Sequence, residues 1–341
     1  MKNLSAFISI PIVIIATLIL INHTYSGPEW STKNIKLLGT TVRIQVHHEK
    51  RTVRELAITK VIEEFHRIES KFSPYIKDSE LSQINTQAFE TKIRLSNEAA
   101  ELLRFSQQTS QQTEGAFDIT YASVGHLYDF RKKTQPAQEQ FIKALPGIGI
   151  NNLLLDEKNN LRFKHPNTKI SFGGFAKGYA VKQAIEIIKG YGISNALVTA
   201  GGDSMVIGQK NGHPWRTGIK APRKKHQAVY TFSLSNKAIS TSGDYERYFI
   251  DNEGDRVHHI VNPSTGKSAS DVHSVTVIGN DPMQTDALST AIFVMGTNKG
   301  LVLAENLDDI EVLIIDKSGE FYKSTGFPAH EDFIQLKDDN S

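Results

Sequence analysis

The feature that most limits the fold is an alternation of two apolar periodicities, which runs from residue 42 to residue 315 without a linker. Period-two segments are typical of half-buried strands, and apolar residues at i, i+3, i+4 and i+7 are typical of the helices that cover them. This mixture predicts an α+β fold in which sheets pack against helices in a single body. We expect strands at 42–46, 152–156, 161–163, 169–172, 196–199, 204–207, 274–278 and 311–315, and helices at 52–69, 97–113, 177–190, 284–295 and 298–306.

Four features of the sequence mark the boundaries of this pattern. Pro74 disfavours helix at the residue before it, so the first helix should end near Phe72. Ser96 is a suitable N-cap for the helix that follows it. Residues 131–147 are polar with two prolines and predict a loop or a short helix, whereas residues 27–36 are expected to form a polar linker.

Composition excludes several classes of protein. The 341 residues include no cysteine, which excludes disulfide scaffolds, cysteine-ligated metals, cysteine nucleophiles and a lipid-modified N-terminal cysteine. Lys and Arg number 39 against 37 Asp and Glu, a formal charge of +2. Because proteins that coat nucleic acid need a basic surplus, no nucleic-acid partner is expected.

The N-terminal segment is apolar and uncharged. Residues 3–28 contain no Asp, Glu, Lys or Arg, the stretch Ala6–Ile21 is almost wholly apolar, and Lys2 precedes it. This pattern predicts that residues 1–26 are a signal peptide or an N-terminal membrane anchor, and that residues 27–341 form the functional domain. Either alternative places the body outside the cytoplasm, on the periplasmic side if the source is a Gram-negative bacterium.

Two glycine-rich clusters follow predicted strands. In Ser171–Ala180 a strand leads into two glycines and then a helix with Lys177 in its first turn, which favours either a phosphate site or a tight strand–helix turn. The segment lacks the standard nucleotide-binding motifs. Ala200–Asp203 is a Gly-Gly-Asp corner, for which a hairpin turn is the simpler interpretation.

Two further clusters contain titratable side chains. Ser240–Arg247 leads to His258–Gly266, where adjacent histidines point to opposite faces, so only one can face a given site. That histidine is either a proton carrier or a structural residue beside an Asn-Pro turn. In Thr285–Thr290, Asp286 and Thr290 share one helix face and offer hard oxygen ligands for Mg²⁺ or Ca²⁺. An acidic first helical turn is the alternative explanation.

In their order and approximate spacing, these clusters resemble the ApbE family of FAD:protein FMN transferases. Three more segments carry the resemblance over most of residues 38–326: Leu38-Gly39-Thr40, Ser73–Asn85 and Gly115-Ala116-Phe117-Asp118. The resemblance implies an ApbE-like, T-fold-like body of mixed sheets and helices. It also implies transfer of the FMN moiety of FAD to a threonine or serine hydroxyl of an acceptor protein, with release of AMP.

The same resemblance assigns roles to particular residues. It implies that FAD is the substrate and that a divalent cation, Mg²⁺ or alternatively Ca²⁺ or Mn²⁺, assists the reaction. Gly174, Asp286 and Thr290 are expected to bind this metal, and His259 to act at the phosphates or on the acceptor hydroxyl. The residues expected to contact FAD are Leu38, Tyr75, Ala116, Phe117, Asp118, Ser171, Lys177 and Val261.

Two residues depart from the family pattern. Ser171 stands where the family usually has an aspartate, which puts recognition of the adenine or ribose in question, and Asn262 replaces a common aspartate at a turn. By family analogy the acceptors are membrane redox subunits of Na⁺-translocating NADH:quinone reductase or Rnf-type complexes. Two alternatives are a metal-dependent FAD pyrophosphatase and a non-catalytic, exported FAD-binding protein.

Overall fold

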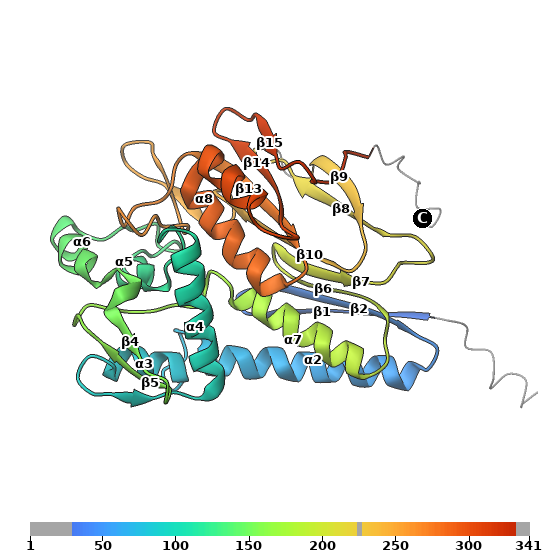
Figure 1. Cartoon of the computed structure of the whole chain (residues 1–341), viewed down its shortest axis with the longest axis horizontal. Helices are drawn as coiled ribbons and strands as arrows, with labels where there is room; N and C mark the ends of the chain where they lie inside the picture. Colours follow the sequence, from blue (N-terminus) through green and yellow to red (C-terminus); the bar gives the residue numbers. More distant parts are fainter. Residues whose placement is uncertain (1–28, 224–226, 332–341) are drawn as a thin grey trace, which may run out of the picture.

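An antiparallel sheet of eight strands forms the centre of the computed structural model, which describes residues 29–223 and 227–331 (Figure 1). The strand order is β1-β2-β6-β7-β10-β13-β14-β15. The predicted α+β class and single body are confirmed. The strands are β1 (Glu29–Leu37), β2 (Thr40–His48), β6 (Asn195–Ala200), β7 (Asp203–Ile207), β10 (Lys237–Gly243), β13 (Val272–Gly279), β14 (Glu311–Asp316) and β15 (Phe321–Lys323).

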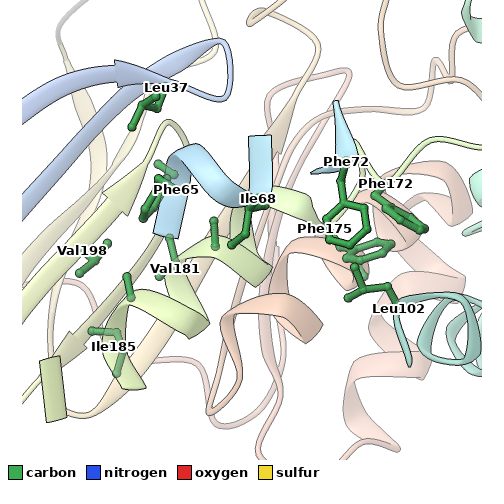
Figure 2. Packing of buried hydrophobic residues seen from close by; sticks show 14 of the residues in the cluster. Leu37, Phe65, Ile68, Phe72, Leu102, Phe172, Phe175, Val181, Ile185 and Val198 are labelled. Carbon is green, nitrogen blue, oxygen red and sulfur yellow. The ribbon is translucent and has the colours of Figure 1, made fainter. Parts of the chain in front are cut away.

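Three long helices cover one face of this sheet: α2 (Arg51–Phe72), α7 (Ala176–Gly190) and α8 (Pro282–Glu305) (Figure 1). Apolar residues spaced by three or four lie on the buried side of each helix, as the sequence pattern predicts. Figure 2 shows Phe65 of α2, Val181 of α7 and Val198 of β6 meeting in the core, where all three are fully buried.

A two-stranded ribbon covers the opposite face of the sheet. It consists of β8 (Trp215–Lys220) and β9 (Ala228–Leu234), and Phe232 is fully buried in the cluster beneath it. Strand β14 shows how one sequence serves both faces, because Ile314 packs with the helices whereas Leu313 packs with the ribbon.

The smaller elements form a layer at one end of the sheet, where α2 ends and α7 begins (Figure 1). There Phe72 of α2 packs on Phe172, and Phe172 packs on Phe175, with ring centroids 5.4 and 5.3 Å apart (Figure 2). The helices and strands of this layer are α3 (Glu80–Gln87), α4 (Asn97–Gln112), α5 (Ala122–Gly125), α6 (Gln138–Ala144), β3 (Ile93–Arg94), β4 (Leu153–Leu155) and β5 (Asn160–Phe163). Short 3₁₀ turns span Ile119–Tyr121, Leu145–Gly147 and Ile150–Asn152, and a separate hairpin comprises β11 (Tyr248–Ile250) and β12 (Arg256–His258).

The predicted linker at 27–36 is wrong where the structure describes it, because residues 29–36 belong to edge strand β1. Strand β1 pairs with β2 through a two-residue turn whose members, Leu38 and Gly39, both have positive φ (52° and 68°). That conformation suits the right-handed twist of a hairpin. The polar side chains that suggested a linker lie on an exposed sheet edge. The predicted leader at residues 1–26 lies outside the described residues.

The predicted strand at 169–172 is also wrong. The backbone N–H of Ile170 donates to Asn85 Oδ1 at 2.7 Å, and its carbonyl accepts from Asn85 Nδ2 at 2.9 Å. One side-chain amide therefore satisfies this backbone in place of a neighbouring strand.

The two helices predicted at 284–295 and 298–306 both occur, as the two segments of α8 that meet at a kink at the non-helical residue Gly296 (φ 77°, ψ −177°). By length and composition α8 is apolar enough to cross a membrane. Half of its apolar stretch is buried inside the protein, however, where the helix packs on β10 and β13. Asp286 and Thr290 lie near the beginning of this helix, which packs on α7 and β10.

Candidate functional site

Several turns meet at the end of the sheet where α7 begins. Gly201 donates its backbone N–H to Thr41 O at 3.1 Å, and Thr241 donates its own to Gly202 O at 3.1 Å. The β1–β2 turn, the β6–β7 turn and the last residues of β10 are therefore neighbours. A Cβ at Gly202 would lie 2.8 Å from Thr241 O, so the absence of a side chain allows these two segments to approach closely.

Gly178 brings α7 into close contact with α8. A Cβ at Gly178 would lie only 2.1 Å from the carbonyl oxygen of Pro282 and 2.8 Å from Asp286 Cβ. Without a side chain, the Gly178 N–H donates to Asp286 Oδ2 at 2.9 Å. The first turn of α7 thus binds a carboxylate with a free backbone donor, an arrangement that the helix dipole favours.

A buried charge cluster lies at this junction. Lys177 Nζ is 2.8 Å from Asp203 Oδ2 and 3.4 Å from Asp286 Oδ2. Asp203 is 1% exposed and Asp286 is 3% exposed. Two carboxylates share one ammonium group, so with all three ionised the cluster carries one surplus negative charge in a region of low dielectric constant.

The pKa shifts follow from this imbalance. Burial, and then the charge of Asp203, raise the pKa of Asp286 above its ordinary value, although Lys177 opposes the shift. Burial lowers the pKa of Lys177, but the two carboxylates outweigh burial and raise it. An additional cation next to Asp286 is therefore electrostatically favoured.

The residues at the junction fit a divalent metal. Thr290 lies one helical turn after Asp286, and its Oγ1 is 3.4 Å from Ser242 Oγ. Asp203 Oδ2 makes no hydrogen bond of good geometry within residues 29–223 and 227–331. No group of three or more His, Cys, Asp or Glu suited to a metal occurs in those residues, so protein oxygens of other kinds must complete the set. A carboxylate, a hydroxyl and the backbone carbonyl of Gly174 are ligands that Mg²⁺ accepts beside substrate phosphate.

His259 lies beside this cluster, immediately after the β11–β12 hairpin. Its backbone N–H donates to Arg247 O at 3.2 Å, and its Nδ1 is buried with no hydrogen-bond partner in the described part of the chain. Burial, followed by the charges of Arg247, His258 and Lys177, lowers the pKa of His259 to about 3. A neutral imidazole can accept a proton or a hydrogen bond at neutral pH.

His258 is the structural member of the histidine pair. It is 3% exposed, its Nε2 lies 2.6 Å from Ala269 O, and its ring packs edge-on against Phe293. The adjacent histidines therefore have different surroundings, as expected for consecutive residues at the end of a strand.

Ser171, Gly173 and Gly174 belong to the short segment that leads into α7 beside the cluster, which we call the glycine strap. Ser171 Oγ accepts the Gly173 N–H at 3.1 Å and hydrogen-bonds to the hydroxyl of Tyr121. A Cβ at Gly174 would lie 3.0 Å from the ring of Phe117. Ser171 and Phe117, two of the residues predicted to contact FAD, thus adjoin the strap that leads into Lys177.

A cavity of about 220 Å³ lies between the predicted Gly115–Asp118 segment and the Asn262 turn, and Ala116 and Lys299 are among the residues that line it. Asn262 Oδ1 accepts the backbone N–H of Ser264 at 3.0 Å, which is the turn chemistry that the sequence predicts. A second cavity, of about 620 Å³, lies between α2 and α7 and is lined by none of the predicted site residues.

The other predicted FAD contacts are less concentrated. Asp118 caps a 3₁₀ turn, since its Oδ1 accepts from Thr120 N at 2.8 Å, and Leu38 donates its N–H to Glu69 Oε1 at 2.9 Å. Val261 is buried, whereas Tyr75 is 91% exposed. Their contacts with FAD stay predictions.

Two residues at the site were given no role from sequence. Asp203 belongs to the Gly-Gly-Asp corner, for which a hairpin turn is the simpler interpretation, and that turn is present between β6 and β7. A buried aspartate directly after two glycines was the missed signal. Arg247 belongs to the Ser240–Arg247 cluster, but nothing in the spacing showed that it approaches the turn at Gly39.

Comparisons with known proteins agree with this geometry. The sequence model of the ApbE family matches residues 38–314. The FAD:protein FMN transferase of Haemophilus influenzae is 30% identical over 327 residues, covering 90% of this chain and 93% of its own. The Vibrio cholerae protein of the same name is 29% identical over 331 residues, covering 95% and 98%.

Solved structures give the same result. The ApbE protein of Thermotoga maritima superposes with a TM-score of 0.81 at 35% identity, covering 88% of this chain and 98% of its own. The flavin transferase ApbE of Vibrio cholerae superposes with a TM-score of 0.79 at 28% identity and the same coverage.

Proposed function

This chain belongs to the ApbE family, and on that premise we propose that it is an FAD:protein FMN transferase. It transfers the FMN moiety of FAD to a threonine or serine hydroxyl of an acceptor protein and releases AMP. The observation that carries the proposal is the buried cluster of Lys177, Asp203 and Asp286, in which one ammonium faces two carboxylates. Such a cluster suits a cation that holds the pyrophosphate of a dinucleotide.

The residues divide the work by position. Asp286, Thr290 and the Gly174 carbonyl would hold the divalent cation, for which Mg²⁺ is our proposal because all three ligands are hard oxygens. When bound, the cation withdraws charge from the phosphoryl group and stabilises the leaving phosphate. Lys177 is fixed between two carboxylates and keeps its charge toward the phosphates. Phosphoryl transfer needs mainly such positioning and charge neutralisation.

We propose that His259 acts on the acceptor hydroxyl. In the transfer step the acceptor Oγ forms a bond to the FMN phosphorus, the bridging bond to AMP breaks, and the hydroxyl proton passes to the imidazole. An imidazole that is neutral in the free enzyme is ready for this role without losing a proton first. The AMP phosphate leaves with the bridging oxygen.

We therefore expect His259→Ala to lower the transfer rate while FAD binding is partly kept. In the wild-type protein, NMR titration of the His259 ring should give a midpoint well below its ordinary value near 6.5, because the ring is buried beside cations. A variant that transfers FMN at the wild-type rate at every pH would show that the assigned role is wrong.

The acceptor and the compartment follow from the family and the N-terminus. We propose that the acceptors are membrane redox subunits of Na⁺-translocating NADH:quinone reductase or Rnf-type complexes. The uncharged stretch 3–28 supports export to the periplasmic side, either with cleavage or as a membrane anchor. Mass measurement of the mature N-terminus, with cell fractionation, tests this part of the proposal.

One incubation separates the proposed activity from its alternatives. The protein is mixed with FAD, Mg²⁺ and the flavin-accepting domain of a Na⁺-translocating NADH:quinone reductase subunit. Covalent flavin on the acceptor supports the transferase. Free FMN and AMP without covalent flavin would instead support a pyrophosphatase, and unchanged FAD would leave an FAD-binding protein.

A further inference from the structure

Arg247 is a cation at the site to which the preceding account gives no role. It lies in the turn between β10 and β11, and its side chain is exposed. Within the described residues its guanidinium makes neither an ion pair nor a hydrogen bond. An arginine that lacks a partner on its own chain is free to bind an anion.

Three segments of the site surround Arg247. Its carbonyl accepts the His259 N–H at 3.2 Å, so it is held at the base of the hairpin that carries this histidine. Its Nη2 lies 3.5 Å from the position that a Cβ would occupy at Gly39. Its charge also acts on the His259 ring and on the hydroxyl of Tyr121, which adjoins Ser171. The Arg247 side chain therefore lies next to the β1–β2 turn, and its charge acts on the residues around the glycine strap and on His259.

The neighbouring arginines are already engaged. Arg223 forms a two-pronged ion pair with Asp244, with Nη1–Oδ1 and Nη2–Oδ2 distances of 2.8 and 2.6 Å. Arg256 stacks on Tyr248, with its guanidinium carbon 3.8 Å from the ring centroid. The same Asp244 donates its backbone N–H to His273 O at 3.1 Å, which fixes the start of the turn that presents Arg247. This local network thus leaves Arg247 available.

A charge count shows why the site needs this arginine. Lys177, Asp203 and Asp286 together leave one negative charge, and a divalent cation converts it to one positive charge. The pyrophosphate of FAD brings two negative charges, and the neutral His259 offsets neither. One negative charge remains beside the buried carboxylates, and one guanidinium neutralises it.

We propose that Arg247 binds the pyrophosphate of FAD and stabilises the charge that develops on the departing AMP phosphate, as a further catalytic residue. The proposal rests on the proposed transferase function. Arginine suits this task because its planar fork binds two phosphate oxygens at once and its charge is permanent. The atoms balance as in the transfer step described above, since Arg247 gives up no proton.

The test compares Arg247→Gln and Arg247→Lys with Arg131→Gln, a matched change at another exposed arginine, which has no role in the proposed site. We expect Arg247→Gln to lower kcat/KM for FMN transfer roughly 10²-fold or more, mostly through kcat. Arg247→Lys should keep part of the rate, and added guanidinium ion should partly restore Arg247→Gln. Arg131→Gln should match the wild type.

Binding provides a readout that does not depend on turnover. Calorimetry with FAD, and with ADP as a pyrophosphate that lacks the flavin, should show weaker binding to Arg247→Gln by roughly tenfold at low salt. Wild-type affinity for both ligands, together with a transfer rate within twofold of Arg131→Gln, would overturn the proposal. If the wild type forms no covalent flavin, the transferase function fails, while the ADP measurement still decides whether Arg247 contacts a pyrophosphate.

Discussion

Two partly or fully buried carboxylates, Glu98 and Asp286, show opposite relations to their surroundings. Glu98 accepts hydrogen bonds from Arg67 Nη2 and Tyr179 Oη at 2.7 Å and from Lys71 Nζ at 2.7 Å. Burial raises its pKa, but these donors outweigh burial and lower it to about 2. Asp286 accepts one hydrogen bond from a backbone N–H and shares the ammonium group of Lys177 with Asp203. Burial raises its pKa.

The difference separates a structural cluster from a functional one. The donors of Glu98 come from α2 and α7, so its charge ties three helices together and needs nothing from outside the chain. The charge of Asp286 is not fully compensated by the described residues. A carboxylate that the fold leaves short of positive charge is therefore the place where we propose that a cation and an anionic substrate bind.

Removing the Asp286 carboxylate should have the largest effect. We expect Asp286→Asn to lower FMN transfer by about 10³-fold or more, because the metal loses its only charged ligand. In thermal unfolding, Mg²⁺ should raise the Tm of the wild type and leave that of Asp286→Asn unchanged. Transfer at the wild-type rate in metal-free buffer would refute the metal assignment.

Disturbing the close contact between Gly178 and α8, which positions Asp286, should lower activity nearly as much. Gly178→Ala places a methyl group against Pro282 O, so α7 and α8 must separate, at a cost of about 1–3 kcal/mol of stability and with a large loss of activity. Gly190→Ala, at the other end of α7, meets no atom within 4 Å and is the matched control. It should be neutral or slightly stabilising by chemical denaturation. Equal behaviour of the two variants would mean that the close contact is unimportant.

Breaking the Glu98 cluster should have the opposite effect, a loss of stability without a loss of activity. We expect Glu98→Gln to lower the free energy of unfolding by about 2 kcal/mol, because Arg67 and Lys71 lose a shared partner, while the folded variant still transfers FMN. Glu186→Gln is the control, since its exposed pair with Lys189 should contribute less than about 0.5 kcal/mol. A loss of activity in folded Glu98→Gln would remove the distinction between the two clusters.

The smallest expected effect is on the pH dependence of stability, to which the Glu98 carboxylate should contribute. The pKa of Glu98 is lower in the folded state than in the unfolded state, so its contribution is present above about pH 4.5 and is lost as the pH falls toward 2. As the pH falls over this range, the free energy of unfolding of the wild type should therefore decrease by about 1–2 kcal/mol more than that of Glu98→Gln. Parallel curves would contradict the shift.

Sequence reasoning reached most of the fold because its signals are local. The helix 52–69 and the strand 42–46 follow from side-chain period alone, and both occur within α2 and β2. Residues 29–36 were misread because their polar, exposed side chains hide a strand whose partner, β2, follows after a two-residue turn. Residues 169–172 were misread because their backbone partner, Asn85, is distant in the sequence. No periodicity records such partners.

The site divides in the same way. Lys177, Asp286 and His259 were predicted from motifs and do lie around one junction. Asp203 was missed because its burial beside Lys177 arises from the packing of the β6–β7 turn on α7, not from its neighbours in the sequence. The charge imbalance that defines the cluster becomes visible only when three distant segments are brought together.

The most direct test of the central claim is the Mg²⁺ dependence of FAD binding, measured by calorimetry in the wild type, Asp286→Asn and Glu98→Gln. The account predicts that Mg²⁺ tightens FAD binding at least tenfold, about 1.4 kcal/mol, in the wild type and in Glu98→Gln, and has no effect in Asp286→Asn. An equal Mg²⁺ effect in all three proteins would contradict it, because the cation would then bind without the Asp286 carboxylate.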